Sequence, residues 1–190
     1  NQSVAIGATV TGQYLSAVWT PATGLSNPNA LNTTATVSQT TTYTLTVSGL
    51  SASNLITNGD FNGGLTGFTS DYVQGTGGSF GLLSAEGTFA VSTNANLTHN
   101  NFVNCTDHTG GGSMLVVNGA GTPNQDVWCQ TVAVSPGTNY AFSLWGATVV
   151  ASSPAILQFS INGNLQGSSF SLPTATCQWT QYFQLWNSGG

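Results

Sequence analysis

The acidic side chains of this 190-residue chain are five carboxylates: Asp60, Asp71, Glu86, Asp107 and Asp126. A pair of carboxylates on either side of a sugar bond is the usual machinery of glycoside hydrolysis. A strand presents two acids on one face when they lie two or four residues apart, and no two of these acids have that spacing. Distant acids can still meet in space, but the spacing itself does not favour a hydrolase.

A Ser-His-Asp triad needs a histidine base, and the candidates are His99 and His108. The chain has no G-x-S-x-G elbow, which is the usual setting of the nucleophile in one large class of these enzymes. Asp107 and His108 are adjacent, so on a strand they would point to opposite faces. We therefore expect His108 to be a hydrogen-bonding loop or core residue, and the protein not to be an enzyme.

The chain contains no Lys or Arg, and its formal net charge is −5. Nucleic-acid binding and attraction to an anionic membrane surface both need these cations. Phosphate-binding lysines, arginine fingers and Schiff-base lysines are excluded for the same reason. No apolar run approaches 18 residues, so we also expect no membrane insertion.

The composition predicts an all-β fold, and many short strands at regular spacing indicate a small β-sandwich unit followed by a jelly-roll sandwich. Thr, Ser and Asn number 28, 21 and 18, and there are 24 Gly, which is typical of strands joined by tight turns. Residues 1–50 alternate as short strands around Trp19, residues 48–53 form a small-residue linker, and a second unit spans 54–190. Its strands are expected near 82–91, 113–118, 127–134, 139–149, 155–161 and 178–187. Asn162-Gly163 is the strongest hairpin signal, because this pair accepts the positive φ of a type I′ turn.

Residues 107–118 read DHTGGGSMLVVN and resemble the D-H-T-x-G-x-G stretch of MAM-type extracellular jelly rolls. The resemblance implies that Asp107 helps to hold a structural cation. Calcium prefers carboxylate, amide and carbonyl oxygens, and a glycine-rich backbone can offer carbonyls. We predict Asp60 and Asp107 as ligands, with Glu86 as a further candidate. The alternative is that Asp60 is a turn residue and Asp107 caps a loop.

Aromatic and amide side chains alternate with apolar ones along the last strands. If Tyr140 and Phe142 face the core in one strand and Trp179 and Phe183 in another, the opposite positions form an outer face. That face would carry Trp145, Gln158, Tyr182, Gln184 and Trp186. Such a surface suits a neutral sugar, whose ring stacks on aromatic plates and whose hydroxyls need hydrogen bonds. Cover by a neighbouring loop or subunit, or a bulge that shifts the register, is the alternative.

The second unit resembles the carbohydrate-binding-module-like, galactose-binding jelly rolls of secreted bacterial proteins. Residues 54–61 (NLITNGDF) match their N-L-x-x-N-G-D-F start, residues 127–140 match their paired middle strands, and residues 159–163 match the next hairpin. The chain departs from the family at Asn62, where Glu is frequent. The family's last strand, with its L-D-D ligands, would follow Gly190.

The first unit resembles the short immunoglobulin-like repeats of large surface adhesins of gliding bacteria. The match is W-x-P-x-x-G-L-S-x-x in residues 19–28 and T-T-T-Y-x-x-T-V in residues 40–47. The resemblance implies a cell-surface or secreted protein exported by type IX secretion. Two functions are compatible with it: an adhesin segment that binds a neutral glycan, or a structural spacer or filament subunit whose aromatics are buried against neighbouring copies.

Three cysteines are present, and none belongs to a C-x-x-C pair, which argues against zinc. Because the other features point outside the cell, we favour a disulfide over three buried thiols. The predicted bond joins Cys105 to Cys129, and Cys177 would then find its partner beyond Gly190.

Overall fold

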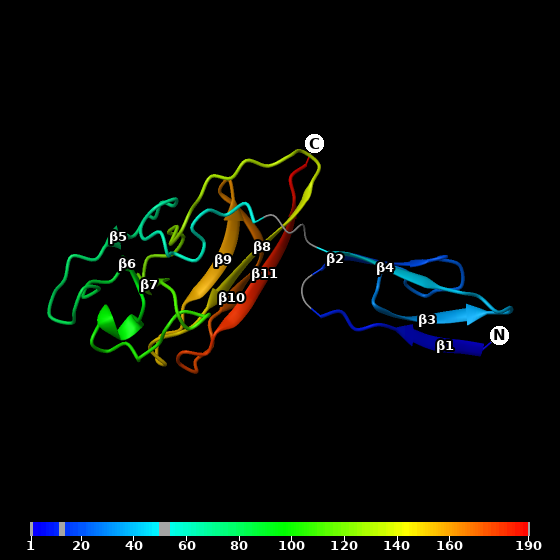
Figure 1. The fold of residues 1–190 in the computed structure, drawn as a ribbon, viewed down its shortest axis with the longest axis horizontal. Coiled ribbons are helices and arrows are strands. Elements are labelled where there is room, and N and C mark those ends of the chain that lie inside the picture. The colour runs from blue at the N-terminus through cyan, green and yellow to red at the C-terminus, as the bar shows by residue number, and fades with distance from the viewer. Residues whose placement is uncertain (1, 12–13, 50–53, 190) are drawn as a thin grey trace. The chain divides into compact units, whose positions relative to one another are not determined.

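The computed structural model describes residues 2–11, 14–49 and 54–189 (Figure 1). In this part of the chain the regular elements are strands, apart from one short 3-10 helix, η1 (Ala95–Leu97). The predicted all-β sandwich class is confirmed, because the strands pair in several small sheets. The strands are β1 (Gln2–Gly7), β2 (Tyr14–Thr20), β3 (Asn32–Val37), β4 (Thr44–Gly49), β5 (Val73–Gln74), β6 (Thr88–Ser92), β7 (Met114–Asn118), β8 (Asn139–Gly146), β9 (Ile156–Ile161), β10 (Asn164–Ser171) and β11 (Thr180–Asn187).

The chain divides into two compact units. The first comprises residues 1–53 with 136–141 and 185–190, and the second comprises residues 54–135 with 142–184. The sequence assigned all of residues 54–190 to the second unit, whereas one end of β8 and one end of β11 group with the first. Among the described residues, no helix is long and apolar enough to cross a membrane.

In the first unit, β1 pairs with β3 and β2 pairs with β4, both antiparallel. Trp19 is buried, as its predicted role in the core requires, and its indole N–H donates to the Ala30 carbonyl at 2.9 Å. Alternate residues of β2 and β3 are buried as well, namely Ala17, Thr33 and Ala35. A core of one indole among small side chains is what a unit of about 50 residues can build.

In the second unit, β6 pairs antiparallel with β7 and parallel with β5, and β9 pairs with β10. The turn between β9 and β10 has positive φ at both Asn162 (50°) and Gly163 (75°). Positive φ at both central residues is the requirement of a type I′ turn. The hairpin predicted at this pair is therefore confirmed.

Aromatic rings join the β8–β11 pair to the β9–β10 pair. Phe142 of β8 meets Phe159 of β9 edge-on with ring centroids 4.7 Å apart. Phe170 of β10 stacks on Tyr182 of β11 with centroids 3.9 Å apart. Edge-to-face and offset contacts of this kind stabilise aromatic pairs beyond the area that they bury. We call these four side chains the aromatic layer.

Residues 127–134 do not form the strand that the sequence predicts. Cys129 makes a single antiparallel bridge to Thr69, with both N–H···O distances 2.8 Å. Next to this bridge, the Gln130 side chain makes the hydrogen bonds that a paired strand would make. Its Oε1 accepts from the Thr57 N–H at 2.9 Å, and its Nε2 donates to the Thr57 carbonyl at 3.0 Å. A carboxamide offers the same donor and acceptor as a peptide group, so one side chain takes the place of a neighbouring strand.

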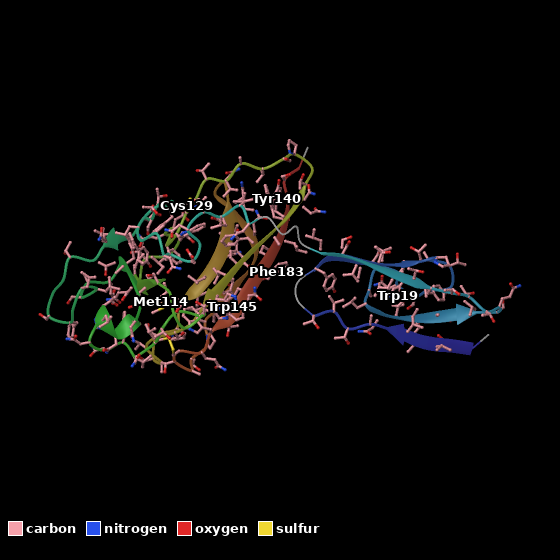
Figure 2. The ribbon with its side chains drawn as sticks, viewed as in Figure 1. Trp19, Met114, Cys129, Tyr140, Trp145 and Phe183 are labelled. Atoms are coloured by element: carbon pink, nitrogen blue, oxygen red, sulfur yellow. A yellow bond between two sulfur atoms is a disulfide. The ribbon has the colours of Figure 1, made fainter. Side chains whose placement is uncertain are left out.

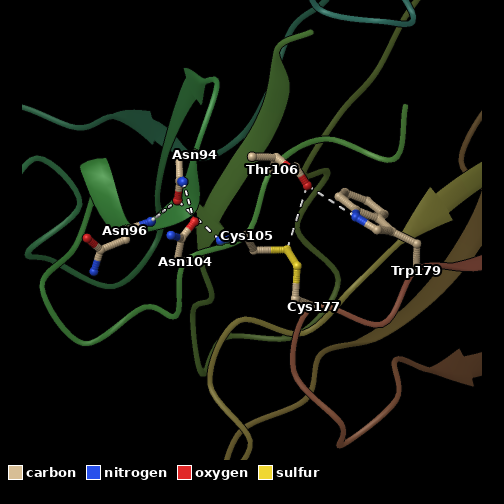
Figure 3. The surroundings of a disulfide bond; sticks show 7 residues. All are labelled: Asn94, Asn96, Asn104, Cys105, Thr106, Cys177 and Trp179. Atoms are coloured by element: carbon tan, nitrogen blue, oxygen red, sulfur yellow. Dashed lines mark hydrogen bonds between the residues drawn. A yellow bond between two sulfur atoms is a disulfide. The ribbon is translucent and has the colours of Figure 1, made fainter. Parts of the chain in front are cut away.

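The core of the second unit surrounds a disulfide between Cys105 and Cys177 (Figure 3). Its buried members are Leu83, Ala90, Ala95, Phe102, Cys105, Met114 and Val116, and Cys177 and Trp179 pack against them. The two cysteines lie 72 positions apart in sequence, with a Cα–Cα distance of 5.4 Å. The disulfide therefore joins the segment before β7 to the segment before β11.

The predicted Cys105–Cys129 disulfide is wrong. Cys105 is buried in the core, whereas Cys129 is exposed and has a free thiol. The bridge to Thr69 holds Cys129 on the surface, while the Cys177 N–H donates to the Thr148 carbonyl at 2.8 Å and so sets Cys177 beside the core. Cys177 thus finds its partner within the chain rather than beyond Gly190.

Removal of the disulfide is expected to destabilise the second unit strongly. Closing a loop of this length lowers the entropy of the unfolded chain, and the stabilisation is about 4 kcal/mol in the chain-entropy model. The double variant Cys105→Ser, Cys177→Ser should therefore lose about that much unfolding free energy in urea titrations. Cys129→Ser is the matched control, since its thiol is exposed and unbonded. Equal losses in the two proteins would contradict the assigned pairing.

Candidate functional site

A polar, glycine-rich loop follows the disulfide and is closed by Asp107. The Oδ2 atom of Asp107 accepts hydrogen bonds from the Thr109 N–H at 2.9 Å and from the Thr109 hydroxyl, and Oδ1 accepts from the Gly112 N–H at 2.9 Å. The Thr109 hydroxyl, followed by the Gly112 N–H, lowers the pKa of Asp107 to about 2. Gly110 has φ +82°, a conformation that L side chains rarely adopt. The loop is thus fixed by one ionised carboxylate.

Asn62 connects this loop to Asp60, which lies 47 positions earlier than Asp107 in sequence. Its Oδ1 accepts from the Ser113 N–H at 2.9 Å, and its Nδ2 donates to Asp60 Oδ2 at 2.9 Å. A Cβ at Gly112 would lie 3.0 Å from Asn62 Oδ1 and 3.4 Å from Asp107 Oδ2, so a larger residue would require these side chains to shift by a few tenths of an ångström. The structure therefore brings Asp60 and Asp107 to opposite sides of one carboxamide.

Glu86, the third predicted calcium ligand, lies elsewhere. It precedes Gly87, whose N–H bonds the Asn118 carbonyl at the far end of β7. Asp107 and Ser113 lie at the Met114 end, and a five-residue strand spans about 13 Å. Glu86 is therefore too distant to share a cation with Asp107.

The structure provides some of the oxygen ligands that the predicted calcium site requires. Calcium needs six to eight oxygens, and the described residues contain no group of three or more His, Cys, Asp or Glu side chains around one point. Protein N–H groups already donate to both carboxylates, in the manner of a turn residue at Asp60 and a loop cap at Asp107. Asp60 and Asp107 would hold the ion, with the remaining ligands from backbone or water, and calcium binding stays a prediction.

An aromatic cluster lies beside the same loop. His108 stacks on Trp145 of β8, with ring centroids 3.7 Å apart and planes 19° apart. Trp179 meets His108 edge-on at 6.2 Å, and its indole N–H donates to the Thr106 carbonyl at 3.2 Å. Trp145 nevertheless keeps 43% of its surface exposed. Figure 2 labels its position on β8. We call His108, Trp145 and Trp179 the aromatic platform.

A hollow of about 330 Å³ opens on the residues that precede and follow His108. Its lining consists of Thr93, Asn94, Leu97, Thr106, Asp107 and Gly110–Gly112. Asn94 is fixed there, because its Oδ1 accepts from the Asn96 and Cys105 N–H groups at 3.1 and 3.2 Å. The hollow thus offers hydroxyl, carboxylate and backbone groups beside one apolar side chain.

The five predicted sugar-contacting residues do not form one face. Tyr182 belongs to the aromatic layer, and its hydroxyl donates to the Ser171 carbonyl at 2.7 Å. Phe142 lies in that layer too, and Trp145, three residues further along β8, points to the opposite face of the strand. The prediction that Trp145 and Tyr182 share an outer face is therefore wrong.

The register of β8 and β11 explains the error. The Ser188 N–H bonds the Thr138 carbonyl at 3.0 Å, and Trp186 meets Tyr140 with ring centroids 5.9 Å apart. Even-numbered residues of the two strands therefore share a face, so Gln184 and Trp186 follow Tyr182 and are half-buried. A difference of one residue in register exchanges the two faces.

Of the remaining residues, Gln158 is used within its hairpin, where its Nε2 donates to the Gly167 carbonyl at 2.7 Å. The sequence assigned Trp179 to the core and His108 to a loop or core position, and missed that His108 contacts both Trp145 and Trp179. The missing signal was the cysteine pairing, because Trp179 follows Cys177 and His108 follows Cys105 by a few residues.

Comparison with family models, curated proteins and solved structures finds no match to the chain.

The stability of the loop is expected to depend on acid. Because the pKa of Asp107 is lowered in the folded state, its contribution is present above the unfolded pKa of about 4 and is lost as the pH falls to about 2. Asp107→Asn should lower the Tm at neutral pH, and the Tm values of variant and parent should converge in acid. Glu86→Gln is the control. A Tm difference unchanged from neutral pH to about pH 2 would contradict the role of Asp107.

Proposed function

We propose that this protein is a non-catalytic, extracellular adhesin segment that binds a neutral glycan at the aromatic platform and the adjoining hollow. The observation that carries the proposal is the exposed indole of Trp145, held flat against His108 beside a polar loop. The apolar face of a sugar ring stacks on such a plate, and its hydroxyls need the donors and acceptors that the hollow supplies.

The size and charge of the site support the same ligand class. A volume of about 330 Å³ lies within the range of small-molecule sites. Asp107 is the sole charged side chain that lines the hollow, and the sequence provides no Lys or Arg to bind an acidic sugar. Asp107 and His108 are consecutive, so their Cα atoms lie about 3.8 Å apart. The platform and the hollow are thus neighbours along one loop, and we expect one oligosaccharide to touch both.

The extracellular assignment rests on the disulfide. Bonds of this kind persist in oxidising surroundings and are rare in the cytosol, and Cys105–Cys177 lies within the core rather than at a reactive edge. The adhesin role and type IX export come from the resemblances described in the sequence analysis.

A filament subunit is the second candidate, favoured by one observation. On the outward face of β9–β10, Ile156 and Leu165 are 70% and 63% exposed. Leu165 pairs with Ser160 and shares its face, and Ser160 shares a face with Ile156 by strand alternation. Concentration-dependent assembly that Ile156→Ser and Leu165→Ser abolish, together with the absence of glycan binding, would favour this candidate.

The glycan proposal predicts a specific loss of binding in Trp145→Ala. On an array of neutral oligosaccharides, the best ligand of the parent protein should bind the variant about tenfold more weakly or worse, because a stacking contact worth about 1.4 kcal/mol is removed. Phe80→Ala is a matched control, since Phe80 also stacks on a histidine, His99, and is 48% exposed. Equal binding by both variants, or no glycan bound by the parent, would refute the proposal.

Calcium binding is tested separately by thermal unfolding. If Asp60 and Asp107 hold the ion, calcium at 100 times its Kd should stabilise the protein by about 2.7 kcal/mol, and a chelator should reverse the rise in Tm. Asp60→Asn should abolish the response, whereas Glu86→Gln should retain it. An identical Tm with calcium and with chelator would show that the two carboxylates serve the protein's own N–H groups alone.

A further inference from the structure

Four asparagines of the chain are followed by glycine: Asn58, Asn62, Asn118 and Asn162. In such a pair the backbone nitrogen of the glycine can approach the carboxamide carbon of the asparagine, because glycine has no Cβ to obstruct it. The approach also requires that the carboxamide rotate freely. The four side chains differ in this respect.

Asn58 and Asn62 are held within one turn. Asn58 Nδ2 donates to the carbonyls of Gly64 and Thr66 at 2.9 and 2.8 Å, and Asn58 Oδ1 accepts from the Gly63 N–H at 2.7 Å. Asn62 is fixed through its bonds to Asp60 and Ser113. The Gly63 nitrogen, which would have to attack Asn62, is itself committed to Asn58.

Asn118, the last residue of β7, is held by the loop that precedes β6. Its Nδ2 donates to the carbonyl of Leu83 at 2.8 Å and to that of Ala85 at 3.2 Å. Three of the four carboxamides therefore have fixed partners, and each must break at least two hydrogen bonds before it can react.

Asn162 lies at the exposed tip of the β9–β10 hairpin. Within the described part of the chain its carboxamide makes no hydrogen bond, and neither does the N–H of Gly163. A Cβ placed on Gly163 would meet nothing within 4 Å, so the turn can open without a steric obstacle. Asn162 and Asn58 have nearly the same φ, +50° and +51°, so the free carboxamide of Asn162, and not its backbone conformation, distinguishes the two sites.

We propose that Asn162 is a site of spontaneous deamidation, and that it is the one Asn-Gly pair left reactive by folding. The Gly163 nitrogen loses its proton to solvent and bonds to the Asn162 Cγ, and ammonia leaves with a proton taken from water. Water then opens the resulting succinimide at either carbonyl, which leaves aspartate or isoaspartate at position 162. Water is the co-reactant, and nothing is oxidised or reduced.

The reaction changes the hairpin in two ways. It adds a carboxylate to a chain that has no Lys or Arg to pair with it. The isoaspartyl product also adds one carbon to the main chain inside the turn that sets the pairing of Ile161 with Asn164. Both products alter the tip of the β9–β10 hairpin, whose strands carry Phe159 and Phe170 of the aromatic layer.

The test is to incubate the folded, disulfide-intact protein in mildly alkaline buffer and to map the replacement of NH₂ by OH by mass spectrometry. Pepsin or chymotrypsin must be used, because trypsin has no cleavage site in the chain. Asn162 should react roughly tenfold faster than the other three sites, since each of those must first release hydrogen bonds.

Two controls separate the effect of the fold from that of the sequence. In urea with reductant the four sites should react at similar rates, because the hydrogen bonds that protect three of them are absent. Asn162→Gln should remove the reaction at position 162 and leave the other sites unchanged. If Asn162 reacts no faster than Asn58, Asn62 or Asn118 in the folded protein, or does not react at all, the inference is wrong.

Discussion

The Cys105–Cys177 disulfide is the constraint on which the second unit depends. Its short strands and single 3-10 turn leave a core of modest size, and small cores of this kind often need a covalent link. The bond also organises the surface. His108 follows Cys105 by three residues and Trp179 follows Cys177 by two. The covalent link therefore positions two of the three residues of the aromatic platform. Only Trp145 comes to the platform from a strand.

Uncharged polar side chains make hydrogen bonds between distant segments of this protein, where other proteins often use ion pairs. Gln130 makes the hydrogen bonds of a missing strand, Asn62 joins Asp60 to the Ser113 N–H, and Asn94 fixes one side of the hollow. Each bond is worth about 1 kcal/mol net, but each also closes a loop whose backbone would otherwise be unpaired. The charged residue Asp107 is likewise held by N–H and O–H donors rather than by a Lys or Arg side chain.

Local chemistry was predictable from the sequence, and register was not. The all-β class, the buried Trp19 and the hairpin at Asn162-Gly163 each follow from a few neighbouring residues. The face of Tyr182 depended on how β11 pairs with β8, and a slip of one residue reverses it. The partner of Cys105 depended on two segments that meet only after folding. Residues 127–134 do not form the expected strand, because the Gln130 side chain makes the hydrogen bonds to Thr57 that a neighbouring strand would have made. The alternation of apolar and polar residues does not predict such a contact.

The same disulfide has a mechanical meaning. A pulling force applied through the two ends of the chain passes across the sulfur–sulfur bond and bypasses the 72-residue loop that it closes. That loop holds about 250 Å of contour length, and it includes β7 to β10, His108 and Trp145. His108 and Trp145 lie inside this loop, so a pulling force does not pass along their part of the backbone. Tension reaches them through the contact of Trp179 with His108 and through the pairing of β8 with β11.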